Sequence, residues 1–361
     1  MSKKKICFIA QFPPPIHGLS KAVETLYNAE KDTALTYQKI DITNNKAFLG
    51  NLLQLVRSDA DLYYFTISQT VGGNIRDLVL LKILELKKKK CLIHLHGGYY
   101  RSLVENDMKS WQKKANYAAI SKLAGTIVLS KSLKTIFLGM IDEKKIFVVE
   151  NCVDDQYLLP DEYIKEKIIR QKNADIKNIL WLSNFIRSKG YDIVLQMAKK
   201  EKERVTQGFT QKYHFHFAGK FFDEAEKEYF ENFIKQNSLL KFITYHGVVG
   251  GKEKSNLLNM CDIFMLPTRY PNEGQPISIL EAMGNGMFII TTDHAGIPDI
   301  VSNENGIVLK KDDTIDALYK QLCNYDIDQF CSICKNNFFI AKEKYTQKRY
   351  TKKIEEIFLS I

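Results

Sequence analysis

Short apolar runs alternate with longer amphipathic stretches along most of the 361-residue chain. This alternation is typical of parallel sheets whose strands are joined by crossover helices. In the first half it predicts strands at 6–10, 62–66, 91–96, 125–129 and 146–149, with helices at 20–30, 75–87, 111–121 and 131–138. In the second half it predicts strands at 179–183, 214–218, 242–246, 263–266, 288–292 and 307–309, with helices at 191–204, 224–236, 253–261, 277–285 and 315–324. The pattern therefore predicts an α/β protein with two doubly wound sheets.

A polar, charged stretch at 154–177 separates the two series and is interpreted as the connection between two domains. We place a Rossmann-like N-terminal domain at 1–160 and a Rossmann-like C-terminal domain at 175–330. The remaining residues, 331–361, are expected to form a helical tail. Because ligands of such sheets bind outside the carboxyl ends of the strands, candidate chemistry is sought in the loops that follow strands.

The composition is that of an ordinary globular protein, with 45% apolar and 26% charged residues. No apolar run approaches the ~18–20 residues of a membrane span. The N-terminal Met-Ser-Lys-Lys-Lys is followed by only five apolar residues, too few for the core of a secretory signal, so we expect a cytoplasmic protein. The seven cysteines have no repeated close spacing, which favours a reducing compartment over a disulfide framework or a zinc site.

The positive charge of the chain is confined to its first half. Residues 1–151 contain 23 Lys and Arg against 13 Asp and Glu, whereas residues 152–361 contain 29 of each. A one-sided basic surface suits a polyanion such as nucleic acid, an anionic membrane or a phosphorylated substrate, but a solvated lysine-rich surface would give the same count. Near Trp111, Tyr99 and Tyr100, the candidate contacts with anionic lipid headgroups are Lys82, Lys87, Lys88, Lys89, Lys90, Lys109, Lys113, Lys114 and Lys122. Lys87 to Lys90 could equally form a solvated turn before the strand at Cys91.

The strongest chemical signal lies at 266–284, where an apolar strand is followed by a glycine-containing loop and a helix. Pro276 and Ile277 stand where that helix begins, so its unpaired backbone N–H groups could bind an anion. Glu273 on the loop and Glu281 in the helix carry carboxylates that suit ribose or sugar hydroxyls. A helix acid and an unrelated surface acid would have the same spacing.

This segment resembles the Glu-x7-Glu region of retaining glycosyltransferases of family 4, which have the GT-B fold. The resemblance includes the strand and loop Trp181–Gly190, covers 179–309 densely, and covers the first half more loosely through Phe12–Gly18, His94–Gly98 and Val149–Asn151. It also includes, in the family's order, Phe217-Ala218-Gly219, His246-Gly247, Asp262–Pro267, Gly296–Val301 and Asn305-Gly306. It implies two Rossmann-like domains facing a central cleft, with the acceptor on the first, the donor on the second, and the tail crossing back to the first.

The resemblance also implies roles for individual residues. Lys189 would neutralise the diphosphate leaving group, Glu281 would hold the ribose, and Glu273 would contact hydroxyls of the transferred sugar. The same donor site would include Gly274, Pro276 and Ile277. Where Asn184 stands the family often has an arginine, for which Arg187 is the candidate replacement.

Two further positions are candidates in the first half. His94 and His96 share one face at the end of a predicted strand, because side chains alternate along it. A zinc site would need a third ligand, and none is evident, so we expect no metal and no other cofactor. By the resemblance His96 faces the cleft and bonds the sugar or shapes the acceptor site, while His94 is expected in the core. Gly18, followed by Leu19 where the family often has a second glycine, lets backbone approach the substrate closely.

These features predict a retaining glycosyltransferase that moves a sugar from a nucleoside-diphosphate sugar to a glycan acceptor. Such bacterial-looking enzymes commonly extend lipid-linked surface glycans of the capsule, O-antigen or exopolysaccharide type. We therefore expect the protein at the cytoplasmic face of the inner membrane. A catalytically weak nucleotide-sugar-binding scaffold of the same fold remains the alternative, given Asn184 and Leu19. Nucleic-acid binding is not expected, because the basic half lacks an aromatic-basic module.

Overall fold

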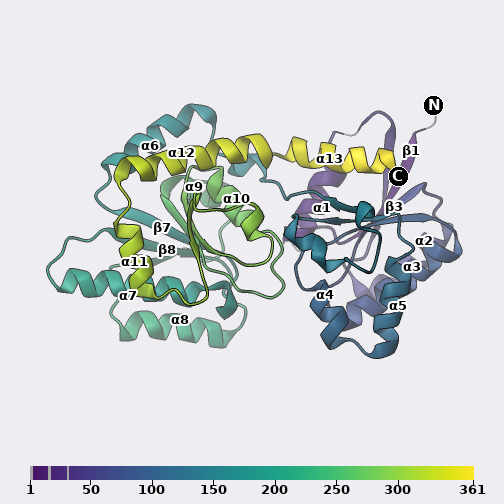
Figure 1. The fold of residues 1–361 in the computed structure, drawn as a ribbon, viewed down its shortest axis with the longest axis horizontal. Helices are drawn as coiled ribbons and strands as arrows, with labels where there is room; N and C mark the ends of the chain where they lie inside the picture. Colours follow the sequence, from purple (N-terminus) through teal and green to yellow (C-terminus); the bar gives the residue numbers. More distant parts are fainter. Residues whose placement is uncertain (1–2, 15–17, 31) are drawn as a thin grey trace. The chain divides into compact units, whose positions relative to one another are not determined.

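The computed structural model describes residues 3–14, 18–30 and 32–361, and divides the chain into two compact units (Figure 1). Residues 15–17 of the predicted proline-rich loop lie outside the described residues. Unit 1 is made of Met1–Cys152, Asn272–Gln275 and Gln347–Ile361, and unit 2 of Val153–Pro271 and Pro276–Thr346. Each unit is built on one parallel sheet.

Unit 1 contains a six-stranded parallel sheet in the order β2-β1-β3-β4-β5-β6. Its strands are β1 (Lys4–Ala10), β2 (Leu35–Asp41), β3 (Leu62–Thr66), β4 (Lys90–His94), β5 (Gly125–Val128) and β6 (Ile146–Val148). Its helices are α1 (Gly18–Asn28), α2 (Phe48–Arg57), α3 (Val71–Leu86), α4 (Tyr100–Ser102), α5 (Ser110–Ile120) and α13 (Gln347–Ser360). Side chains of β1 alternate between two cores, since Phe8 packs with α1 and α13 whereas Ile9 packs with α2 and α3.

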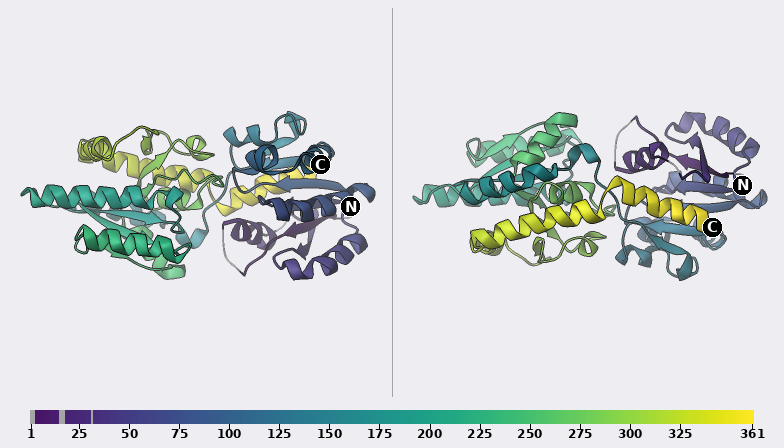
Figure 2. Two further views of the ribbon diagram at one scale, coloured as in Figure 1. Left: turned by 90° about the horizontal axis from the view of Figure 1, so that it is seen from below. Right: turned by 90° about the horizontal axis from the view of Figure 1, so that it is seen from above.

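The final helix of the chain belongs to unit 1. Tyr350, Ile354 and Phe358 recur every four residues, so α13 buries one face, and the two views of Figure 2 show it on one side of this sheet. Phe358 meets Phe8 edge to face at 6.1 Å between ring centres. The hydroxyl of Tyr37 donates to Glu355 over 2.7 Å, which ties the helix to β2.

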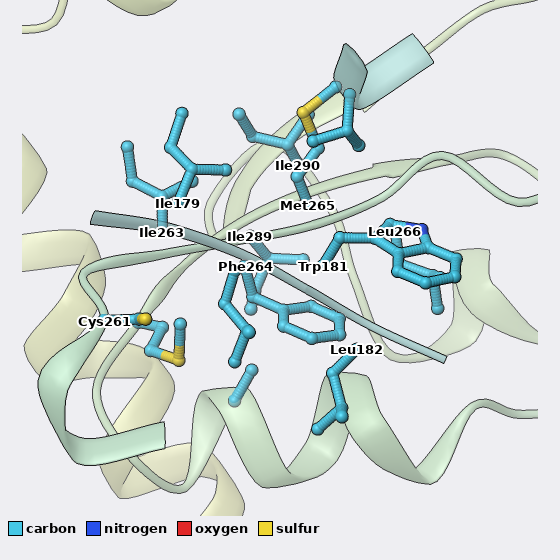
Figure 3. Close-up of a cluster of buried hydrophobic side chains, with 14 of the residues drawn as sticks. Ile179, Trp181, Leu182, Cys261, Ile263, Phe264, Met265, Leu266, Ile289 and Ile290 are labelled. Carbon is cyan, nitrogen blue, oxygen red and sulfur yellow. The ribbon is translucent and has the colours of Figure 1, made fainter. Parts of the chain in front are cut away.

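Unit 2 contains a second six-stranded parallel sheet, in the order β12-β11-β10-β7-β8-β9. Its strands are β7 (Lys177–Leu182), β8 (Tyr213–Ala218), β9 (Ile243–Tyr245), β10 (Ile263–Leu266), β11 (Phe288–Thr292) and β12 (Gly306–Leu309). Its helices are α6 (Ile164–Asn173), α7 (Tyr191–Thr206), α8 (Glu224–Gln236), α9 (Gly251–Met260), α10 (Ile277–Met283), α11 (Ile315–Cys323) and α12 (Ile327–Lys344). The central strands are buried on both faces, and Figure 3 shows their side chains projecting to both sides of β10.

Four elements differ from the sequence prediction. β2 and α2 were not predicted. β2 is an edge strand that buries only Leu35 and Ile40 and so shows no clean period. The apolar residues of α2 do recur with a helical period, at 48–49, 52–53 and 55–56, and the prediction missed them. The segment 154–177, expected only to connect domains, contains α6 and is part of unit 2. Some of its polar residues are buried and form hydrogen bonds there. The ammonium of buried Lys167 donates to the carbonyl of Leu258 at 2.9 Å. The helix predicted at 131–138 is a short 3-10 helix, Ser132–Ile136.

Among the described residues, no helix is both long enough and apolar enough to cross a bilayer.

Candidate functional site

The order of strands in unit 2 locates a switch point between β7 and β10. From β7 the chain winds outward through β8 and β9, and from β10 it winds the other way through β11 and β12. In open α/β sheets, ligands bind at the carboxyl edge beside such a switch point, which is where the loops that follow β7 and β10 lie. Most of the donor-site residues predicted from the sequence lie on these two loops.

The turn from β7 to α7 carries Lys189. Its backbone carbonyl accepts a hydrogen bond from the indole of buried Trp181 at 3.2 Å, and its ammonium lies 5.0 Å from the ring centre of Tyr270, which follows β10. Gly190 has a φ of +79°, and a Cβ there would lie 2.4 Å from the carbonyl oxygen of Pro267. Glycine is therefore required by both the left-handed backbone and the contact between the two loops.

The other cation of this turn is engaged differently. The guanidinium of Arg187 donates to Glu226 of α8 at 3.2 Å and lies 3.4 Å from the ring centre of Tyr229. Its backbone N–H also donates to Glu226, at 3.0 Å. Asn184 is exposed on the same loop. The structure thus fixes Lys189 and Arg187 on one turn but gives Arg187 a carboxylate partner of its own.

The loop after β10 is fastened to both neighbouring strands. The backbone N–H of Arg269 donates to the carbonyl of Ser188 at 2.7 Å, and the carbonyl of Tyr270 pairs with His294 at 2.8 Å. The loop rejoins unit 2 at Pro276, which caps α10, so the helix begins at Ile277. The predicted helix start is therefore at the predicted residues, with Pro276 just outside the helix rather than in its first turn.

Glu281 lies in α10 and is buried. Its carboxylate accepts a hydrogen bond from the ammonium of Lys254 of α9 at 2.7 Å, and that ammonium lies 4.2 Å from the ring centre of Tyr157. Burial raises the pKa of Glu281, and the charge of Lys254 opposes that rise. A buried carboxylate held by one cation is a fixed acceptor for hydroxyl hydrogens.

The segment Asn272–Gln275 packs within unit 1, on the loop that follows β4. The N–H of Gly98 donates to the carbonyl of Asn272 at 3.4 Å, and a Cβ on Gly274 would lie 2.8 Å from the carbonyl oxygen of His96. The structure therefore brings Glu273, which is 8% exposed, into the same neighbourhood as half-buried His96.

Polar contacts hold this segment in place. The side chain of Gln275 accepts from the backbone N–H of Asn151 at 2.7 Å and donates to the carbonyl of Leu129 at 3.1 Å. The amide of Asn151 donates in turn to the carbonyl of Gln275 at 2.9 Å. The loops after β5 and β6 thus fix the backbone just after Glu273, at Gln275.

The two other candidates of unit 1 have separate surroundings. His94 is fully buried, its Nδ1 lies 2.6 Å from the hydroxyl of Tyr64, and burial lowers its pKa well below the usual value. The interpretation of His94 as a core residue is confirmed. Gly18 begins α1, next to the switch point of the first sheet between β1 and β3.

Sequence reasoning missed the partners of the predicted residues. Lys254, Glu226 and Gln275 each contact a predicted residue or its loop, and none belongs to a recognisable motif. Lys254 lies 27 positions before Glu281, so only the packing of α9 against α10 brings them together. In the ranges that the structure describes, no group of three or more His, Cys, Asp or Glu side chains is placed to hold a metal ion.

The amino-acid sequence of unit 2 matches a known protein family. Residues 164–325 match the family model of glycosyl transferases group 1. The predicted resemblance to glycosyltransferases is confirmed at that level, and the matched segment contains Lys189, Arg187 and Glu281. Family 4 is a finer assignment than this match gives.

Two curated relatives and one solved structure are similar to the chain. An uncharacterized 41.2 kDa protein in the cps region of Klebsiella pneumoniae is 27% identical over 65% of this chain, and the putative colanic acid biosynthesis glycosyltransferase WcaL of Escherichia coli is 24% identical over 46%. The chain spans 61% and 40% of the lengths of these two relatives. Anabaena Alr3699/HepE, solved in complex with UDP, has a TM-score of 0.75 at 15% identity and covers 99% of this chain and 100% of its own. The predicted GT-B fold is confirmed.

Proposed function

We propose that the protein is a retaining glycosyltransferase that transfers a sugar from a nucleoside-diphosphate sugar to a glycan acceptor. The observation that carries the proposal is the placement of Lys189, on a turn fixed by Trp181 and Gly190, at the switch point of a sheet inside the group 1 segment. The family 4 assignment rests on the resemblance over residues 179–309, which includes the Glu-x7-Glu region of Glu273 and Glu281 and the loop with Lys189.

In this proposal unit 2 binds the donor. Breaking the bond between the sugar C1 and the diphosphate oxygen builds negative charge on the leaving group. Lys189 stabilises that charge without reorganisation, because its turn is fixed before the reaction begins. Glu281, which is held in place by its hydrogen bond from Lys254, accepts hydrogen bonds from the ribose hydroxyls. Arg187 becomes a second phosphate contact only when it leaves Glu226.

Unit 1 supplies the remaining groups. Glu273 contacts hydroxyls of the transferred sugar, and His96 bonds the sugar or shapes the acceptor site, with Gly274 and Gly18 allowing close approach of backbone. The acceptor hydroxyl forms the new bond to C1 on the face from which the diphosphate departs, and its proton passes to the departing diphosphate oxygen, so the anomeric configuration is retained. The domain roles, acceptor on 1–160 and donor on 175–330, follow the resemblance.

We propose a lipid-linked acceptor in bacterial surface polysaccharide synthesis. Support comes from the relatives, one encoded in a cps region and one named for colanic acid biosynthesis. A lipid-linked acceptor requires the protein to work at the cytoplasmic face of the inner membrane. The excess of positive charge in residues 1–151 suits that surface.

The proposal is tested by incubating the purified protein with a panel of nucleoside-diphosphate sugars, with and without polyprenyl-linked glycan acceptors. We expect released nucleoside diphosphate and a product whose anomeric configuration, read by proton NMR, matches the donor. We expect the activity to persist in excess EDTA, since Lys189 supplies the positive charge at the diphosphate. Tight donor binding without sugar release would favour the scaffold alternative, and an inverted product would contradict the retaining mechanism.

A further inference from the structure

The outer surface of unit 1 carries an apolar face on two neighbouring helices. Its members are side chains of α2 and α3 that are each 40 to 75% exposed: Leu49, Leu53, Val56, Ile75, Val79 and Leu86. On α2 the three residues follow a spacing of four and three, and on α3 they follow four and seven, so each set lies on one side of its helix. A cluster of this size on the surface of a globular unit marks a binding surface.

The two sets form one continuous face because α2 and α3 lie side by side and run in the same direction. Arg76, in the first half of α3, donates to the side chain of Asn45, just before α2, at 3.2 Å. At the other end the ammonium of Lys87, just after α3, donates to the carbonyl of Val56 near the end of α2 at 2.7 Å. Half-buried Leu52 and Ile83 fill the seam between them. Residues three or four positions apart are neighbours on the surface of a helix. Leu49 and Val56 therefore lie beside Leu52 on α2, and Val79 and Leu86 lie beside Ile83 on α3. The exposed residues thus flank the seam on both helices.

A groove of about 650 Å³ adjoins this face on the other side of α3. Its floor is apolar and is formed by residues such as Leu81 of α3 and Ala118 of α5. It lies at the amino edge of the sheet, since Cys91 opens into it from the start of β4 and Ala124 from just before β5. The groove is therefore at the opposite edge from the His96 loop and is separate from the candidate catalytic residues.

The rim of this groove is strongly basic. Among the described residues it carries six lysines: Lys82, Lys88, Lys89, Lys90, Lys122 and Lys145. Two carboxylates pair with lysines of the rim in the part of the chain that the structure describes. Glu85 accepts from Lys82 at 3.0 Å and from Lys122 at 2.6 Å, and Asp59 pairs with Lys89 at 2.5 Å. The rim therefore keeps a clear excess of positive charge beside an apolar floor.

We propose that the apolar face and the lysine-rimmed groove together dock unit 1 on an anionic phospholipid bilayer. The apolar side chains enter the headgroup and acyl boundary, and the rim lysines bind lipid phosphates, with acyl carbon covering the groove floor. Each lysine close to an anionic leaflet adds on the order of 1 kcal/mol, screened by salt. A second copy of the chain fits poorly, because a two-fold contact would set the lysine rims against each other.

This proposal identifies the part of unit 1 that contacts the membrane. It rests on the proposed function in one respect only, the assumption that the acceptor is linked to a lipid. α3 spans about 24 Å from the carboxyl edge of the sheet to the amino edge. At its start, Gln69 accepts from the N–H of Tyr99 at 2.9 Å, next to the His96 loop. A bilayer lying along α3 would therefore also reach the acceptor side of unit 1.

Of the lysines expected to contact lipid, those of the rim line the apolar groove, whereas Lys109, Lys113 and Lys114 at the start of α5 do not. Lys113 pairs with Glu105, and the hydroxyl of Tyr99 donates to Asp107 at 3.0 Å. Trp111 is exposed and lies close to α3, because the neighbouring Gln112 donates a hydrogen bond to the carbonyl of Val71 at the beginning of that helix. Its indole could therefore enter the headgroup region beside the proposed surface.

The test is flotation of the full-length protein with vesicles of phosphatidylcholine, with and without phosphatidylglycerol at about one third of the lipid. We expect binding to the anionic vesicles at low salt and release at high salt. A triple variant of the rim, Lys82→Gln, Lys88→Gln and Lys122→Gln, should weaken partition about tenfold or more. A triple variant of the apolar face, Leu53→Gln, Val79→Gln and Leu86→Gln, should weaken partition at low salt as strongly.

Matched controls come from exposed positions of unit 2. Lys311→Gln, Lys320→Gln and Lys335→Gln remove the same charge, and Phe222→Gln, Leu240→Gln and Val248→Gln remove exposed apolar side chains. We expect these sets to leave partition unchanged. Equal loss from a control set, equal binding to neutral and anionic vesicles, or self-association without lipid that the apolar variant abolishes would each overturn the proposal. Donor cleavage in solution is measured in parallel, so a failure of docking is distinguishable from a failure of the glycosyltransferase assignment.

Discussion

Unit 1 and unit 2 share an architecture but keep their charges in different places. Each has six parallel strands with a switch point. Unit 2 pairs charges at its carboxyl edge, Lys254 with Glu281 and Arg187 with Glu226, whereas unit 1 exposes lysines at its amino edge. The chain reflects this division, because residues 152–361 balance 29 basic against 29 acidic residues and residues 1–151 do not. The same wound sheet thus supports a fixed polar site in one unit and a basic outer surface in the other.

The comparison is tested most strongly by breaking one ion pair in each unit. Lys254→Ala removes the cation beside buried Glu281 and should lower the free energy of unfolding by about 3–5 kcal/mol. Lys82→Ala breaks an exposed pair with Glu85 and should cost less than about 1 kcal/mol. Urea unfolding in a Trp111→Phe background, followed by Trp181 fluorescence and circular dichroism, separates unit 2 from the whole chain. Similar losses for the two variants would contradict the contrast.

Catalysis should depend on unit 2 through a single ammonium. Lys189→Ala is expected to lower kcat/KM tenfold to a thousandfold while the fold persists, because one well-placed electrostatic contact contributes ~1.4–4 kcal/mol. Steady-state kinetics with the donor identified by the panel provides the measurement. Arg187→Ala is the comparison on the same turn, and its effect should be smaller since Arg187 is held by Glu226. Sugar transfer at the normal rate by the Lys189→Ala variant would show that Lys189 does not stabilise the leaving group.

A pair of glycines sharpens the comparison at the level of the backbone. Gly190 in unit 2 and Gly139 in unit 1 have φ values of +79° and +77°, but only Gly190 has Pro267 where a Cβ would stand. Gly139→Ala should lower the free energy of unfolding by about 1–2 kcal/mol, because of its left-handed backbone alone. Gly190→Ala should lower it by about 1–3 kcal/mol more, because its Cβ would also overlap Pro267. Thermal unfolding measures both. Equal costs would show that the contact between the β7 and β10 loops is not rigid.

The smallest expected effect is a pH dependence of unit 2. Burial, with the neighbouring His214 and His246, lowers the pKa of His216 to about 3. The unfolded chain takes up the proton near pH 6.5 and the folded chain does not, so stability is full above that pH and falls between about pH 6.5 and 3. We expect a loss of about 1 kcal/mol at pH 5.5 relative to pH 7.5. His216→Asn should reduce the change in unfolding free energy with pH, as followed by Trp181 fluorescence. An unchanged pH dependence in this variant would argue against His216 as its cause.

Much of the fold could be predicted because buried parallel strands leave continuous apolar runs. β10 and β11 appear in the sequence with the bounds that the structure gives them. The loops that follow β7 and β10 could likewise be identified, since ligand sites follow strand ends. β2 escaped prediction because an edge strand needs few buried residues, and α6 because its buried Lys167 looks like a surface residue until its carbonyl partner is known.

Individual residues of the candidate site could be predicted from the sequence, but the side chains that they contact could not. Glu281 stood out by spacing, yet Lys254 did not, because ion pairing across 27 residues depends on how α9 packs on α10. The position of Asn272–Gln275 within unit 1 was equally hidden. It depends on Gln275 bonding backbone groups of Asn151 and Leu129, more than 120 residues earlier in the chain. Contacts of this range leave no periodic signal in a single sequence.

The central claim, a nucleoside-diphosphate site at the β7 and β10 switch point, is tested most directly by thermal-shift titration. Nucleoside diphosphates and their sugar conjugates are titrated against the wild type, Lys189→Ala and the surface control Lys311→Gln. At ~100 times Kd a true ligand should stabilise the wild type and the control by about 2.7 kcal/mol, and Lys189→Ala should need a much higher concentration. No shift with any nucleoside diphosphate, or the same titration for Lys189→Ala as for the wild type, would contradict the account.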